Sequence, residues 1–123
     1  MKLRIKGNSI RLRLTKTEIT NFGEHWILEE RTEFPNAVFL DYCLQAKTGI
    51  DKLEAEFTQN KITVFVPVTM VQQWTTTEIV GFKNNMDFGD GKQLFLLIEK
   101  DFVCLDETTE DQSDNYENPS KTC

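Results

Sequence analysis

Features that mark membrane and secreted proteins are missing from this sequence of 123 residues. It has no apolar run of about 18 residues, roughly the shortest stretch that crosses a membrane as a helix. Near the N-terminus, Lys2, Arg4 and Lys6 interrupt the apolar residues, whereas a secretory signal needs an unbroken apolar stretch. We therefore expect a protein that stays in the cytoplasm and has no membrane partner.

Cysteine and histidine are also scarce. The three cysteines, Cys43, Cys104 and Cys123, form no CxxC pair, and His25 is the single histidine. An odd number of cysteines argues against a disulfide framework, and structural zinc sites need four ligands. We expect a buried thiol at Cys43, and neither a metal nor a cofactor. A zinc site from Cys104, Cys123 and His25, or a pairing of the two C-terminal cysteines, is the alternative.

Catalytic motifs are absent as well. The sequence contains neither the GxSxG motif of serine hydrolases nor a P-loop, and it shows no internal repeat. Residues 106–117 have the length of an EF-hand loop, but Asp111 stands where that loop needs glycine. We predict no catalytic residues, and favour a protein that is not an enzyme.

The charge of the chain is divided between its two ends. Residues 1–100 hold 13 basic and 13 acidic side chains, so the whole net charge of −6 lies in residues 101–123. Residues 1–16, in contrast, contain six bases and no acid. We predict a single globular domain over residues 1–105 and an acidic C-terminal tail over 106–123, because the tail has the composition of a disordered segment.

Most of the chain shows the period of two that is typical of strands. In residues 3–14, apolar residues alternate with basic ones on both sides of Gly7-Asn8, which predicts a β-hairpin with one basic face. Further strands are expected at 26–34, 37–46, 52–58, 61–66 and 78–83. Residues 94–98 are apolar without alternation, which predicts a strand buried on both faces in the middle of a sheet.

Two short helices interrupt these strands. Thr15 and Glu18 have the spacing of a capping box, and Gly23 offers a left-handed stop. A second helix is expected from Pro67 to Trp74, before three threonines that are poor helix formers. The resulting fold class is α+β, a mostly antiparallel sheet, curved or half-barrel, with one or two short helices.

The basic face of the hairpin is the candidate functional site. We predict that it binds anions through the five side chains Lys2, Arg4, Lys6, Arg11 and Arg13. The alternative is a solvated face whose charge is compensated by Glu29, Glu33, Glu54 and Glu56 from neighbouring strands. The acidic tail is expected to compete for the basic face, or else to act only as a solubilising segment.

These observations lead to two functional hypotheses. The first is a small binding module without enzymatic activity, whose basic hairpin engages an anionic ligand or protein partner. The second is a small enzyme acting on a phosphorylated substrate. In it, the arginines would hold the phosphate, and Glu54 or Glu56 would serve as base or metal ligand. The enzyme requires these groups to converge in one concave pocket, whereas the module requires only a basic surface. The sequence leaves the ligand and the oligomeric state open.

Both ends of the chain are distinctive. Residues 1–15, residues 99–105, and the pairs Glu110-Asp111, Ser113-Asp114 and Asn118-Pro119 resemble a family of short uncharacterised bacterial proteins, common in the Bacteroidetes group. The resemblance implies a bacterial cytoplasmic origin, and it implies that the tail and Cys104 belong to the family's design. It implies no activity.

Overall fold

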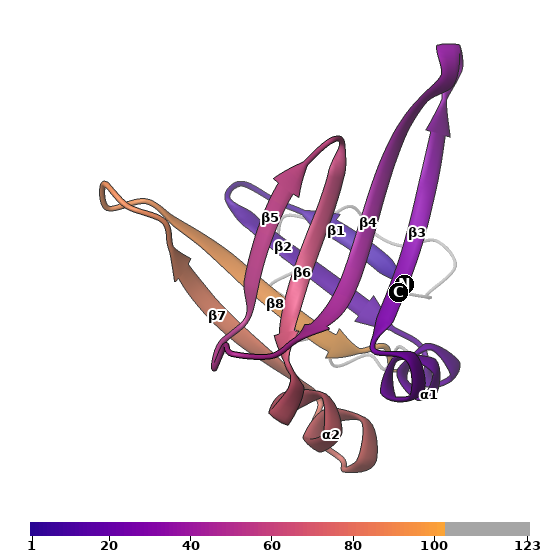
Figure 1. Cartoon of the computed structure of the whole chain (residues 1–123), viewed down its shortest axis with the longest axis vertical. Helices are drawn as coiled ribbons and strands as arrows, with labels where there is room; N and C mark the ends of the chain where they lie inside the picture. The colour runs from indigo at the N-terminus through magenta and orange to yellow at the C-terminus, as the bar shows by residue number, and fades with distance from the viewer. Residues whose placement is uncertain (103–123) are drawn as a thin grey trace, which may run out of the picture.

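The computed structural model describes residues 1–102 (Figure 1), so the expected tail, Cys104 and Cys123 lie outside the described residues. Within these residues the chain forms eight strands, two α-helices and one 3₁₀ turn. In order they are β1 (Lys2–Ile5), β2 (Ser9–Leu14), α1 (Lys16–His25), β3 (Ile27–Phe34), the 3₁₀ turn (Pro35–Ala37), β4 (Val38–Lys47), β5 (Glu54–Thr58), β6 (Lys61–Pro67), α2 (Val68–Thr76), β7 (Gly81–Asp87) and β8 (Gln93–Lys100).

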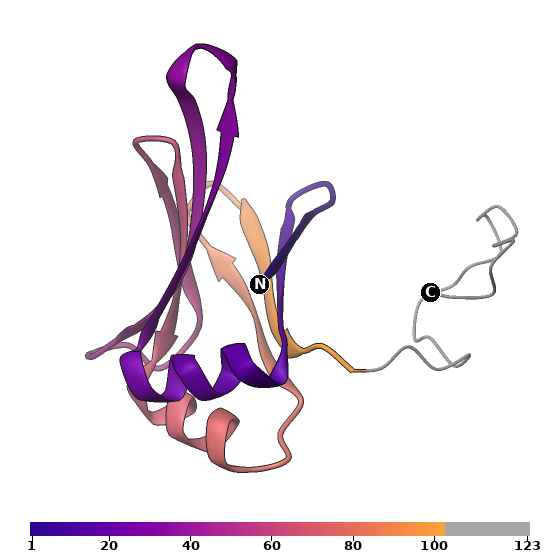
Figure 2. The same ribbon diagram turned by 90° about the vertical axis from the view of Figure 1, so that its right-hand side faces the viewer.

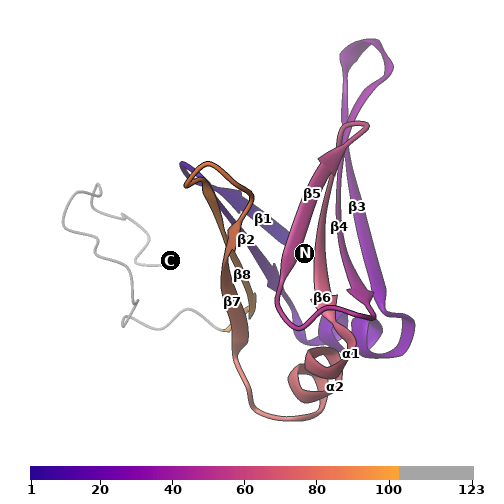
Figure 3. The same ribbon diagram turned by 60° about the vertical axis from the view of Figure 1, so that its left-hand side comes forward.

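The strands form two four-stranded sheets, with the orders β1-β2-β8-β7 and β3-β4-β6-β5. We call them sheet A and sheet B. Figure 3 shows them as two arms that diverge from a common helical end. The α+β class and the mostly antiparallel pairing are confirmed, and β8 is central as predicted. It is not buried on both faces, since Phe95 and Leu97 on its outer face are only half-buried. The chain makes two sheets, however, and the described strands close no barrel.

The centre of each sheet is a parallel pair, β2 with β8 and β4 with β6. The four hairpins around these pairs are antiparallel. Short turns specify hairpins locally, whereas parallel neighbours must come from distant parts of the chain. The sequence pattern therefore predicted the hairpins but not the way in which they join.

The two helices lie side by side and close one end of the molecule (Figure 2). Phe22 of α1 meets Trp74 of α2 edge to face, with ring centroids 6.1 Å apart, and both side chains are fully buried. The backbone of α1 at Gly23 also lies close to the Thr75 side chain of α2, because a Cβ built on Gly23 would lie 3.0 Å from the Thr75 Oγ1. Aromatic burial and this close approach fix α1 against α2.

The ends of the helices differ in part from the sequence prediction. The capping box of Thr15 and Glu18 is present, but α1 continues through Gly23 to His25. The left-handed position is Trp26, with φ of 64°, and its side chain is 47% exposed. Trp26 therefore lies at the C-cap outside the core, whereas Trp74 is fully buried.

The two halves of the described chain repeat one ββαββ unit. Exchanging β1-β2-α1-β3-β4 with β5-β6-α2-β7-β8 converts the strand order of sheet A into that of sheet B. Through both first hairpins and helices, each residue corresponds to the residue 52 positions later, as Phe22 does to Trp74. The repeat escaped the sequence analysis because burial at equivalent positions is retained while most residue types differ.

The core lies between the inner faces of the sheets and against the helices. It is built from alternate residues of the central strands, as the period of two predicts. The fully buried side chains there include Leu12, Leu14, Leu44, Val64, Val66, Leu96 and Ile98. The residues that alternate with them, among them Arg11 and Arg13, consequently lie on the outer faces of the sheets.

Gly81 allows β7 to pair closely with β8, which gives a direct test of this packing. A Cβ at this position would overlap the carbonyl oxygen of Ile98 and would lie 2.9 Å from the Glu99 Cα. Because backbone atoms cannot move aside cheaply, Gly81→Ala is expected to lower the free energy of unfolding by about 1–3 kcal/mol. Urea denaturation measures this loss. Asn85→Ala on the exposed face of β7 should change it by less than about 0.5 kcal/mol, and equal effects would contradict the register.

Candidate anion-binding face

The five predicted basic side chains come together on the outer face of sheet A. Lys2 lies opposite Arg13 and Arg4 lies opposite Arg11 across the β1–β2 hairpin. Leu3 and Leu12, between them in the strands, turn inward to the core. Lys6 follows in the turn that Gly7 makes with φ of 54°. The alternation of residues along two paired strands is therefore what gathers these charges.

Two shallow hollows indent this basic face. One has a volume of about 330 Å³ and is lined by Lys2, Leu3, Arg4, Arg11 and Arg13. The other has a volume of about 250 Å³ and is lined by Arg4, Lys6, Ser9 and Arg11. Arg4 and Arg11 border both hollows, so they stand at the centre of the face.

Two carboxylates from the end of sheet A contact the basic face. Glu99 lies 2.7 Å from the Arg13 Nε and 3.6 Å from the Arg11 Nε. Asp101 lies 3.0 Å from the Nζ of Lys2, whose side chain is 73% exposed. These partners could not be predicted from sequence patterns, because it is the parallel β2–β8 pairing that brings Glu99 beside the hairpin.

The compensating glutamates expected from the sequence lie elsewhere. Glu29 and Glu33 belong to β3, and Glu54 and Glu56 belong to β5, so all four are in sheet B. Glu29 pairs with Lys61 at 2.9 Å, and Glu54 with Lys47 at 3.6 Å. The convergence that an enzyme would need, of Glu54 or Glu56 with the arginines of the hairpin, is therefore not present.

The outer face of sheet B contrasts with that of sheet A because acidic and basic side chains are mixed on it. Besides the two pairs just described, Arg31 donates hydrogen bonds to both carboxylate oxygens of Asp41, at 2.8 and 3.0 Å. These hydrogen bonds lower the pKa of Asp41. The two sheets thus present outer faces of different electrostatic character.

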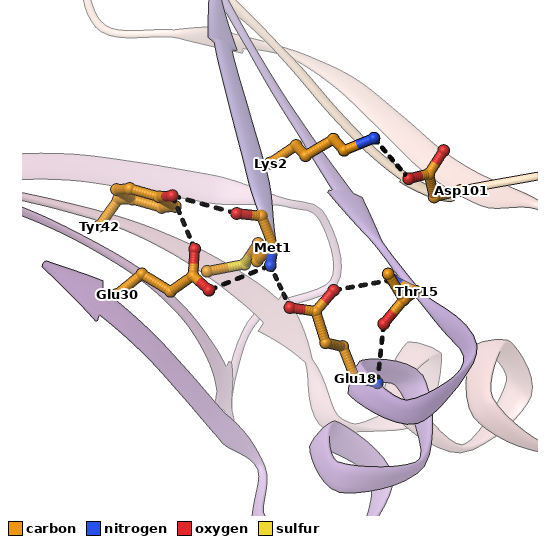
Figure 4. Close-up of polar contacts among 7 residues, drawn as sticks. All are labelled: Met1, Lys2, Thr15, Glu18, Glu30, Tyr42 and Asp101. Carbon is orange, nitrogen blue, oxygen red and sulfur yellow. Dashed lines mark hydrogen bonds and ion pairs between the residues drawn. The ribbon is translucent and has the colours of Figure 1, made fainter. Parts of the chain in front are cut away.

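A second polar cluster, shown in Figure 4, connects sheet A, α1 and sheet B at the start of the chain. The terminal ammonium of Met1 contacts Glu18 of α1 and lies 3.2 Å from Glu30 of β3. The Tyr42 hydroxyl lies 2.6 Å from Glu30 and 3.0 Å from the Met1 carbonyl oxygen. Sequence analysis found Thr15 and Glu18 but missed Glu30 and Tyr42, which pair across the β3–β4 hairpin.

Burial and charge act against each other in this cluster. Burial alone would raise the pKa of Glu18, but hydrogen bonds from the terminal ammonium and from Thr15 outweigh it and lower the pKa. Burial would lower the pKa of the ammonium, yet Glu18 and Glu30 raise it. Burial and the hydrogen bond with Glu30 raise the pKa of Tyr42 to about 12. The cluster is therefore a charged contact that holds β1 against α1 and β3.

The equivalent junction of the other half is built from uncharged residues. Met1, Glu18 and Tyr42 correspond to Leu53, Met70 and Leu96. There the contacts between sheets are a hydrogen bond of 2.9 Å from Asn84 to the Leu53 carbonyl oxygen and a contact of the Ala55 N–H with the Met86 sulfur. Both junctions hold the two sheets together, one through the polar cluster and the other through uncharged contacts.

The described residues offer no further group with the composition of a metal site. His25 is exposed at the end of α1, where its Nε2 lies 3.9 Å from a carboxylate oxygen of Glu24, and the other two proposed zinc ligands lie outside the described residues. Cys43 is fully buried as predicted, and burial raises its pKa to about 11. In residues 1–102 no helix has the length and apolarity needed to cross a membrane.

The charge of Glu18 should make stability depend on pH. Because its pKa is lowered in the folded state, its contribution is complete above the ordinary value of 4.5 and is lost as the pH falls through the lowered value. Glu18→Gln is expected to reduce the free energy of unfolding at pH 7 by about 1–2 kcal/mol, with a smaller difference below pH 4.5. Glu24→Gln on the exposed side of α1 is the control. Parallel pH profiles for Glu18→Gln and the unmodified protein would contradict this role.

Comparison with known proteins adds one finding to this geometry. No curated protein and no solved structure matches the chain. A family model matches residues 1–120 and is described as a family of unknown function, DUF7009. This confirms the resemblance to a family without an assigned activity. The chain is a member of the DUF7009 family, whose function is unknown.

Proposed function

We propose that this protein is a small binding module that holds an anionic partner on the outer face of the β1–β2 hairpin. The observation that carries the proposal is the gathering of five basic side chains around two adjoining hollows that share Arg4 and Arg11. Like charges opposite each other across a hairpin cost stability. Anionic oxygens would offset this cost, and arginine can bind them with two hydrogen bonds at once.

The acidic segment 106–123 enters the proposal as a competitor for the same face. It carries six acids against Lys121 on the same chain, and two groups on one chain have a high effective concentration for each other. An external anion would therefore bind more weakly to the full chain than to a shortened one. This proposal also takes residues 1–105 as the binding domain.

The direct test is binding of inorganic polyphosphate at low salt, measured by calorimetry. The double variant Arg4→Gln/Arg11→Gln should bind at least about tenfold more weakly, since it removes two charge-assisted contacts. Arg31→Gln, which removes a positive charge from the outer face of sheet B, should bind like the unmodified protein. Equal losses in both variants would indicate a general charge effect and would contradict a specific face.

Removal of a negative charge next to the basic face should strengthen the binding of polyphosphate. Glu99→Gln removes the carboxylate that contacts Arg11 and Arg13, so it should raise the affinity for polyphosphate severalfold at low salt. Asp41→Asn makes the same change in charge on sheet B and should have no effect. If Glu99→Gln raised the affinity for polyphosphate no more than Asp41→Asn does, the result would count against the proposal.

Competition by the acidic segment has its own test. Deletion of residues 106–123 should raise polyphosphate affinity at low salt, and the gain should vanish in the Arg4→Gln/Arg11→Gln background because the two changes act on one surface. A gain that persists in this background would show that the segment acts through net charge alone.

A further inference from the structure

The outer face of sheet A extends beyond the basic hairpin to β8 and β7, and we propose that the anionic partner bound there is a single-stranded nucleic acid. This inference rests on the proposed function and specifies its ligand. Figures 2 and 3 show both helices at the end of the molecule, so within residues 1–102 no helix covers this face.

The strand register arranges the face in rows. Arg4, Arg11, Leu97 and Lys83 follow one another across β1, β2, β8 and β7. Since neighbouring strands lie about 4.8 Å apart, this row spans about 14 Å. Positive side chains stand at both of its ends. A ligand with repeated negative charges can therefore contact both edges of the sheet at once.

The adjoining row contains the aromatic group that such a ligand would use. Phe95 lies between Ser9 of β2 and Asn85 of β7, and its side chain is half-buried on the outer face. Bases of single strands stack on aromatic rings in this setting, while basic side chains contact the phosphates. The polar groups of Ser9 and Asn85 flank the ring, where they can form hydrogen bonds with the edges of a base.

The phenylalanines of sheet B show a different arrangement. Arg31 lies 4.3 Å from the ring centroid of Phe39, and Lys47 lies 4.8 Å from that of Phe65. On the face of sheet A, Phe95 lies in the row next to the one that contains Arg11 and Lys83.

A nucleic acid fits these observations better than other anions. An acidic peptide would use the arginines but has no general need for a central aromatic ring. An anionic membrane would require apolar side chains that protrude from the surface, whereas Phe95 and Leu97 are half-buried between strands. A base and its phosphate use both the ring and the row of positive charges.

The test compares Phe95→Leu with Phe65→Leu, the same substitution on the outer face of sheet B. Fluorescence anisotropy would measure binding of a labelled single-stranded oligothymidylate to the chain without residues 106–123, while calorimetry follows inorganic polyphosphate. Phe95→Leu should weaken oligothymidylate binding about 5- to 100-fold, the usual effect of losing one stacked base. It should leave polyphosphate binding unchanged. Phe65→Leu should alter neither, and Phe95→Tyr, which keeps the ring, should retain both.

The outcomes separate this inference from the proposed function. Polyphosphate binding without oligothymidylate binding, or equal oligothymidylate affinity in Phe95→Leu and the parent, would overturn the nucleic-acid inference and leave anion binding intact. Binding of anionic vesicles in place of the oligonucleotide would overturn it too. If the parent protein bound neither polyphosphate nor oligothymidylate, the proposed function itself would be rejected. If Phe95→Leu fails to fold, as judged by circular dichroism, Lys83→Gln tests the same face of sheet A. Unchanged oligothymidylate affinity in that variant would overturn the inference.

Discussion

The contact between α1 and α2 is the constraint on which the rest of this structure depends. Each helix joins a hairpin of one sheet to a hairpin of the other, so the packing of Phe22 against Trp74 sets the positions of both sheets. The close approach at Gly23 leaves little freedom in this packing. The sheets then diverge from the helical end, and their outer faces become two separate surfaces.

Local signals in the sequence predicted most of the elements. The alternation around Gly7-Asn8, the capping box at Thr15 and the continuous apolar run at 94–98 each specify a structure through nearby residues. The union of these elements into two sheets required the parallel pairs β2–β8 and β4–β6, which join residues far apart in the chain. No periodic pattern encodes such a pairing. The sequence therefore led to one curved sheet where the chain forms two.

The basic residues of the candidate site could be predicted from the sequence because they are local to one hairpin. Their acidic partners could not, because they come from distant parts of the chain. The five basic residues belong to one hairpin, and period two alone places them on one face. Glu99 reaches Arg11 and Arg13 only through the parallel pair, while the glutamates expected to compensate them belong to the other sheet. In the polar cluster, similarly, Glu18 was visible from its capping spacing, but Glu30 and Tyr42 required knowledge of how the sheets meet.

The repeat within the fold helps to separate the demands of folding from those of function. Lys2 and Arg4 of β1 correspond to Glu54 and Glu56 of β5, which occupy equivalent places in the other sheet. Because the same unit folds with acids at these positions, the fold does not require bases there. Opposed arginines and lysines on β1–β2 also repel one another. A basic face that the fold does not require is what the proposed binding of a negatively charged partner would explain.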